Sequence, residues 1–106
     1  MKYLLDTDTC VYWLRGRVEV RDRWFSEEPD ATAISIITVA ELYYGAACSS
    51  NPDANRKAVS ALIGRVSVLP ISSEAAARFG SIKAGLREAG ALIEDMDLLI
   101  AATALA

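Results

Sequence analysis

Histidine is absent from this chain of 106 residues. Its absence excludes histidine-based catalytic triads and zinc sites with histidine ligands. It also excludes the usual general base for nuclease chemistry without a metal. Any catalysis must therefore rest on carboxylates, lysine, hydroxyl groups or a metal ion.

Cysteine is scarce, since Cys10 and Cys48 are the only two in the sequence. Neither belongs to a Cys-x-x-Cys pair, so zinc-binding and redox motifs are not supported. Both lie among apolar neighbours in the sequence, which predicts buried and unreactive thiols.

Long apolar runs are missing as well. No segment approaches the roughly 20 residues that a membrane-spanning helix needs. The acidic Asp6 also leaves no room for the apolar stretch of a secretory signal, so we expect a cytoplasmic protein. The length and the composition, 53% hydrophobic and 24% charged, predict a single domain over residues 1–106 with a modest core.

The net charge of −3 is not typical of a nucleic-acid-binding protein, because phosphate contacts need local positive charge. Arginines nevertheless gather in one short segment, at Arg15, Arg17, Arg21 and Arg23. Acidic residues lie among them, so this segment is compatible with a solvated face and equally with a phosphate-contacting patch.

Short apolar segments alternate with amphipathic ones along the chain. The expected strands are 3–5, 33–36 and 66–69. The expected helices are 9–15, 20–25, 39–48, 54–63, a long one capped by Ser72 or Ser73 and reaching Ala89, and 97–106. The alternation predicts an α/β fold with a parallel sheet covered by helices on both faces. In such sheets functional groups gather beyond the carboxyl ends of the strands.

Carboxylates occupy the positions that follow these expected strands. Asp6 comes directly after the first strand, Glu41 follows the second by about one helical turn, and Asp97 opens the last helix. Each has a purely structural explanation. Asp6 can cap a helix, Thr38-x-x-Glu41 has the pattern of a capping box, and Asp97 suits the positive end of a helix dipole.

The carboxylates are harder to explain as a set. Asp6 and Glu41 both follow strands, which places them at one edge of a parallel sheet, and Asp8, Asp95 and Asp97 are candidates for the same edge. Several carboxylates in one place repel each other unless a cation compensates them. Mg²⁺ and Mn²⁺ prefer such oxygen ligands, and a bound metal can activate water without histidine.

Motifs along the whole chain resemble the PIN-domain toxins of bacterial toxin–antitoxin pairs, the VapC-like group. The motifs are LLDTD at 4–8, ISIITVAELYYG at 34–45 and IEDMDLLIAA at 93–102. The resemblance implies a PIN-like α/β fold and a Mg²⁺- or Mn²⁺-dependent endoribonuclease that forms homodimers and is inhibited by a cognate antitoxin. It also implies that Asp6, Glu41 and Asp97 are the catalytic, metal-binding acids, whereas Asp8 stands where many relatives have Asn.

The chain departs from the family pattern after its last helix. Relatives continue into a strand, a polar turn with a fourth acid and a closing strand, whereas this sequence ends at Ala106. We therefore expect a domain that is incomplete at its C-terminus, cleaves RNA poorly and associates readily.

Two alternatives of other classes stay open from the sequence. The first is a module that binds antitoxin without cleaving RNA, which the missing fourth acid would favour. The second is a phosphatase of the haloacid dehalogenase type, which shares an Asp-x-Asp after its first strand. That class expects a small hydroxyl residue or Val where this chain has Cys10.

Overall fold

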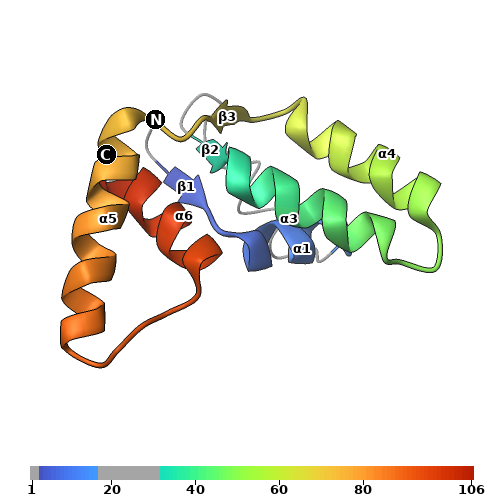
Figure 1. Cartoon of the computed structure of the whole chain (residues 1–106). Helices are drawn as coiled ribbons and strands as arrows, with labels where there is room; N and C mark the ends of the chain where they lie inside the picture. The colour runs from blue at the N-terminus through green and yellow to red at the C-terminus, as the bar shows by residue number, and fades with distance from the viewer. Residues whose placement is uncertain (1–2, 17–31) are drawn as a thin grey trace. The chain divides into compact units, whose positions relative to one another are not determined.

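A computed structural model of the chain describes residues 3–16 and 32–106 (Figure 1). It contains two compact units, Met1–Leu69 and Pro70–Ala106, and each is treated by itself below. The helix expected over 20–25, together with Arg17, Arg21 and Arg23, lies outside the described residues.

The first unit is built on a parallel sheet of β1 (Tyr3–Leu5), β2 (Thr32–Ser35) and β3 (Ser67–Leu69). The strand order is β1-β2-β3, so β2 pairs with a parallel neighbour on each side. Every residue of β2 is buried, as expected of a central strand covered on both faces. The predicted α/β fold with a parallel sheet is confirmed.

The helices of this unit are α1 (Thr7–Leu14), α3 (Ile36–Ala47) and α4 (Pro52–Ile63). Figure 1 shows α3 and α4 running side by side in opposite directions, with α1 against α3. Apolar side chains from all three helices and from β2 form one core. Its buried members are Cys10, Ile34, Val39, Leu42, Ala46, Val59 and Leu62.

Helix α3 begins at Ile36 and not, as the sequence suggested, at Val39. The isoleucines at 36 and 37 have the β-branched side chains that favour strands. The chain turns earlier because Ser35 caps the helix, its Oγ accepting a hydrogen bond from the backbone N–H of Thr38 at 3.1 Å. A good N-cap stabilises a helix start by about 1 kcal/mol, enough to outweigh a weak strand preference.

The second unit pairs α5 (Ser73–Glu88) with α6 (Asp95–Leu105). Ser72 caps α5, and Gly90 follows its end with a φ of 68°, as the sequence predicted. Helix α6 begins at Asp95, earlier than the expected Asp97. In neither described range is any helix long and apolar enough to cross a membrane.

Candidate active site

Asp6 lies between the last residue of β1 and the first residue of α1. Its Oδ1 accepts a hydrogen bond from the backbone N–H of Thr9 at 2.8 Å, so Asp6 is the N-cap of α1. The structural explanation of this residue is therefore correct. The second carboxylate oxygen is still available to a ligand, because Asp6 is exposed and the cap engages only one of the two oxygens.

Glu41 reaches from α3 to the start of α1. Its Oε1 accepts a hydrogen bond from the Thr7 hydroxyl at 2.7 Å, a length typical of a bond to a charged carboxylate. The register of the sheet explains this contact: Leu5 pairs with Ile34, so β1 and β2 end within one residue of each other. The structure thus brings Glu41 to the residue that follows Asp6, beyond the carboxyl ends of two neighbouring strands.

The capping-box explanation of Thr38 and Glu41 is wrong. Ser35 is the N-cap of α3, Thr38 lies inside the first turn, and Glu41 bonds to the Thr7 side chain. The Thr38 side chain is fully buried and contacts Thr7 Oγ1 at 3.4 Å and Ser35 Oγ at 3.5 Å.

Thr7 was not predicted from the sequence as a residue of the site. The signal that could have identified it is a hydroxyl residue directly after the acid that ends the first strand.

The remaining candidate acids lie in the second unit, in the first turn of α6. Asp95 accepts a hydrogen bond from Lys83 of α5 at 2.8 Å, so it forms an ion pair inside this unit. Asp97 is exposed and has no ion-pair partner among the described residues. Of the two acids, Asp97 has both carboxylate oxygens without an ion-pair partner among the described residues, whereas Lys83 engages one oxygen of Asp95.

The joint assignment of Asp6, Glu41 and Asp97 to one metal site stays a prediction. Within the described parts of the chain, no three histidine, cysteine, aspartate or glutamate side chains form a ready-made metal cluster. The donors present nevertheless suit a hard cation, because Asp6 and Glu41 offer carboxylate oxygens and the sequence holds no histidine.

Cys10 lies in α1 and is fully buried. Burial, and then the negative charge of Asp6, raise the pKa of its thiol to about 12. The group therefore stays protonated near neutral pH, as expected of a buried and unreactive thiol. Cys48 differs from our expectation: it is exposed, because it forms the C-cap where α3 gives way to a loop.

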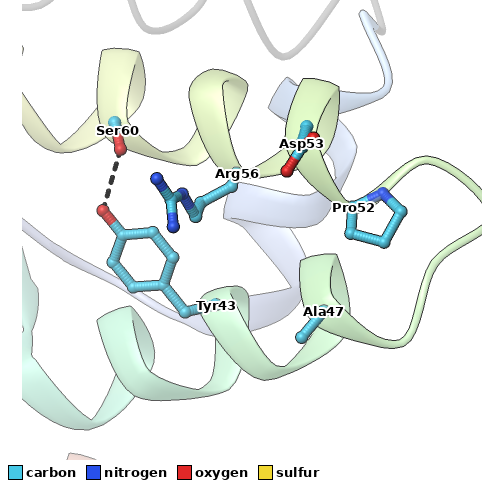
Figure 2. Close-up of a pocket in the computed structure, with 6 residues that line it drawn as sticks. All are labelled: Tyr43, Ala47, Pro52, Asp53, Arg56 and Ser60. Atoms are coloured by element: carbon cyan, nitrogen blue, oxygen red, sulfur yellow. Dashed lines mark hydrogen bonds between the residues drawn. The ribbon is translucent and has the colours of Figure 1, made fainter.

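A groove lies on another side of α3, between this helix and α4 (Figure 2). The residues that line it are Tyr43, Ala47, Pro52, Asp53, Arg56 and Ser60. The Tyr43 hydroxyl and Ser60 Oγ share a hydrogen bond of 2.9 Å, drawn as a dashed line in Figure 2. Arg56 extends over the groove without an ion-pair partner among the described residues.

The sequence model of the PIN domain matches residues 3–106, which is nearly the whole chain. The chain belongs to the PIN-domain family. Curated relatives agree with this assignment. Ribonuclease VapC2 of Haemophilus influenzae is 40% identical over 105 residues, which are 98% of this chain and 79% of the relative. The tRNA(fMet)-specific endonuclease VapC of Salmonella typhimurium is 36% identical over 102 residues, covering 95% and 76%.

Solved structures show the same PIN fold. The structure of DNA-bound VapBC from Salmonella typhimurium matches with a TM-score of 0.91 and 34% identity, over 98% of this chain and 79% of that one. VapBC2 of Rickettsia felis, bound to a DNA fragment, matches with a TM-score of 0.87 and 28% identity, over 98% and 80%. The predicted family and fold are confirmed, and the haloacid dehalogenase interpretation is not favoured.

Proposed function

We propose that this PIN domain is an endoribonuclease toxin that requires Mg²⁺ or Mn²⁺. The observation that carries the proposal is the bond from Thr7 to Glu41, which joins a carboxylate of α3 to the residue after Asp6 at the carboxyl edge of the sheet. Relatives that share most of the chain are named ribonucleases, which supports the same activity.

The metal-binding residues would be Asp6, Glu41 and Asp97. A bound Mg²⁺ or Mn²⁺ would supply charge stabilisation at a phosphate and a water of lowered pKa. The chain itself contributes fixed oxygens. The backbone N–H of Thr9 holds one oxygen of Asp6, and the Thr7 hydroxyl holds one oxygen of Glu41, so each carboxylate presents its other oxygen in a defined direction.

The partners we propose are an RNA substrate in the cytoplasm, an antitoxin and a second copy of the chain. The similar solved structures are toxin–antitoxin assemblies, VapBC and FitAB, which supports an antitoxin as partner. An inhibitor of this kind would also explain how a cell tolerates an RNA-cleaving enzyme.

The test is RNA cleavage by the purified chain with Mn²⁺, with EDTA, and with Mn²⁺ restored after EDTA. We expect cleavage only in the presence of the metal, and we expect Mn²⁺ to raise the melting temperature, since a ligand of the folded state stabilises it. Asp6→Asn keeps the oxygen that caps α1 but removes the charge, so it should abolish both effects.

Glu74→Gln is the matched control for this test, because Glu74 is an exposed acid paired with Arg78 on α5. It should cleave RNA as the parent does. Cleavage that survives EDTA, or an Asp6→Asn protein as active as the parent, would contradict the proposal. A parent chain that binds an antitoxin but cuts no RNA would point to the binding-module alternative.

A further inference from the structure

A chain of hydroxyl groups connects the start of α3 with the Glu41 carboxylate. Ser35 Oγ lies 3.5 Å from Thr38 Oγ1, and Thr38 Oγ1 lies 3.4 Å from Thr7 Oγ1. The last contact, from Thr7 to Glu41, is much shorter at 2.7 Å. Ser35 and Thr38 are fully buried, so their side-chain oxygens depend on partners within the protein.

The direction of the hydrogen bonds follows from counting hydrogens. A threonine hydroxyl has a single hydrogen to donate, so Thr7 cannot donate to Thr38 and to Glu41 at once. The short, charge-assisted bond to the Glu41 carboxylate uses this hydrogen. Thr7 then has no hydrogen left for Thr38, and their contact at 3.4 Å is the longer, weaker alternative for the same Thr7 hydrogen.

We infer that Thr7 is a positioning residue for Glu41, with the buried Thr38 side chain lying against the Thr7 hydroxyl. The inference rests on the proposed function and deepens it. A free glutamate side chain samples many rotamers, whereas the Thr7 bond fixes one oxygen of Glu41 and leaves the other for a cation. Partners that orient a ligand carboxylate in this way contribute strongly to metal affinity.

A role in the fold alone does not account for the Thr7 hydroxyl. Asp6 already caps α1, so the helix start does not need this side chain as a cap. The hydroxyl contacts Glu41 and Thr38, and both contacts are made with α3. Valine has nearly the same shape as threonine and can occupy the same half-buried position. Thr7→Val therefore removes the hydrogen-bond donor with little change in packing.

The experiment measures Mn²⁺ affinity by calorimetry and the melting temperature in EDTA for Thr7→Val and Thr7→Ser. We expect Thr7→Val to lower Mn²⁺ affinity by about 10- to 100-fold, the range seen when an orienting partner of a metal ligand is lost. Thr7→Ser retains the donor and should restore most of the affinity. Both variants should keep the metal-free melting temperature close to that of the parent.

Thr9→Val is the matched control, because it makes the same chemical change in the same turn of α1. The backbone N–H of Thr9 still donates to Asp6, and among the described residues the Thr9 hydroxyl forms no hydrogen bond with Glu41. Its Mn²⁺ affinity should equal that of the parent. Thr38→Val should lower the affinity less than Thr7→Val, since its contact with Thr7 is longer and indirect.

Each outcome decides the question. Parent-like Mn²⁺ affinity in Thr7→Val, while Glu41→Gln has lost it, overturns the role of Thr7 and leaves the proposed function standing. Parent-like affinity in Glu41→Gln overturns the proposed function itself. If Thr7→Val and Thr7→Ala both unfold while Thr7→Ser folds, the hydroxyl serves the fold and the inference is wrong.

Discussion

Two sides of helix α3 use the same backbone for different purposes. Toward α1 the helix presents Thr38 and Glu41, whose side-chain oxygens are held by hydroxyl groups at fixed distances. Toward α4 it presents Tyr43 and Ala47, which line an open groove with one hydrogen bond across it, from Tyr43 to Ser60. On the first side a charged group is held in one orientation, while on the second the Arg56 cation has no ion-pair partner within the described chain.

Chemistry is to be expected on the side of α3 where the charged group is held in place. Holding a carboxylate at a partly buried position costs solvation, and the hydrogen bond from Thr7 offsets part of that cost. A carboxylate held in this way is expected where it has to present a defined oxygen to a ligand. The exposed Arg56 above the groove needs no such support, because its charge stays in contact with water.

The largest expected effect separates these two sides directly. Glu41→Gln keeps an oxygen that can accept the Thr7 hydrogen bond but removes the charge, so we expect RNA cleavage to fall to background. Tyr43→Phe, two positions along the same helix, should cleave RNA as the parent does. Initial rates with Mn²⁺ on one structured RNA measure both. A comparable loss of RNA cleavage in both variants would show that the two sides of α3 do not differ in their role.

The second prediction applies the same contrast to α6. Asp97→Asn should remove most of the rise in melting temperature that Mn²⁺ produces, because the free carboxylate is lost. Asp95→Asn should leave that rise nearly intact, since Lys83 already engages Asp95. Thermal melts with and without Mn²⁺ compare the two. If Asp95→Asn loses the metal response and Asp97→Asn keeps it, the roles of the two acids must be exchanged.

Much of this arrangement could be read from the sequence, though not the contacts. The order of strands and helices, the caps at Ser72 and Gly90, and the place of Asp6 after the first strand follow from local patterns. The start of α3 was predicted too late, because two isoleucines look like the end of a strand until the Ser35 cap is seen.

The contact between Thr7 and Glu41 joins residues far apart in the chain, and no local pattern encodes it. It follows from strand register, which the pairing of Leu5 with Ile34 sets only in three dimensions. The exposure of Cys48 was missed for a related reason. Its apolar neighbours suggested burial, but the position at the C-cap of α3 turns the side chain outward.

A smaller effect tests the groove side of α3. Tyr43→Phe removes the hydroxyl that bonds Ser60 and should lower the free energy of unfolding by about 0.5–1 kcal/mol, the lower part of the usual range, because the pair is exposed to solvent. Ser60→Ala should do the same, and the double variant should cost little more than either change alone. Urea unfolding measures all three. Fully additive losses would show that the two hydroxyls act independently.

The smallest effect concerns the two thiols. Iodoacetamide should modify Cys48 in the folded chain and leave Cys10 untouched, because one is exposed and the other buried with a pKa raised to about 12. Intact mass spectrometry should therefore find a single adduct, and two adducts after unfolding in urea. A Cys48→Ser variant, which should show none in the folded state, assigns the adduct.

The raised pKa of Cys10 also determines how the stability of the fold changes with pH. In the unfolded chain the thiol titrates near the ordinary value of 9.0, whereas in the folded chain it holds its proton until about 12. Above pH 9 the unfolded state therefore binds fewer protons than the folded state, and stability falls as the pH rises toward 12. Cys10→Ala should be less stable near neutral pH, because it leaves a small cavity, but its stability should fall less steeply between pH 9 and pH 11. Urea unfolding at several pH values measures the slopes, and equal slopes in parent and variant would mean that Cys10 ionises as easily in the folded chain as in the unfolded one.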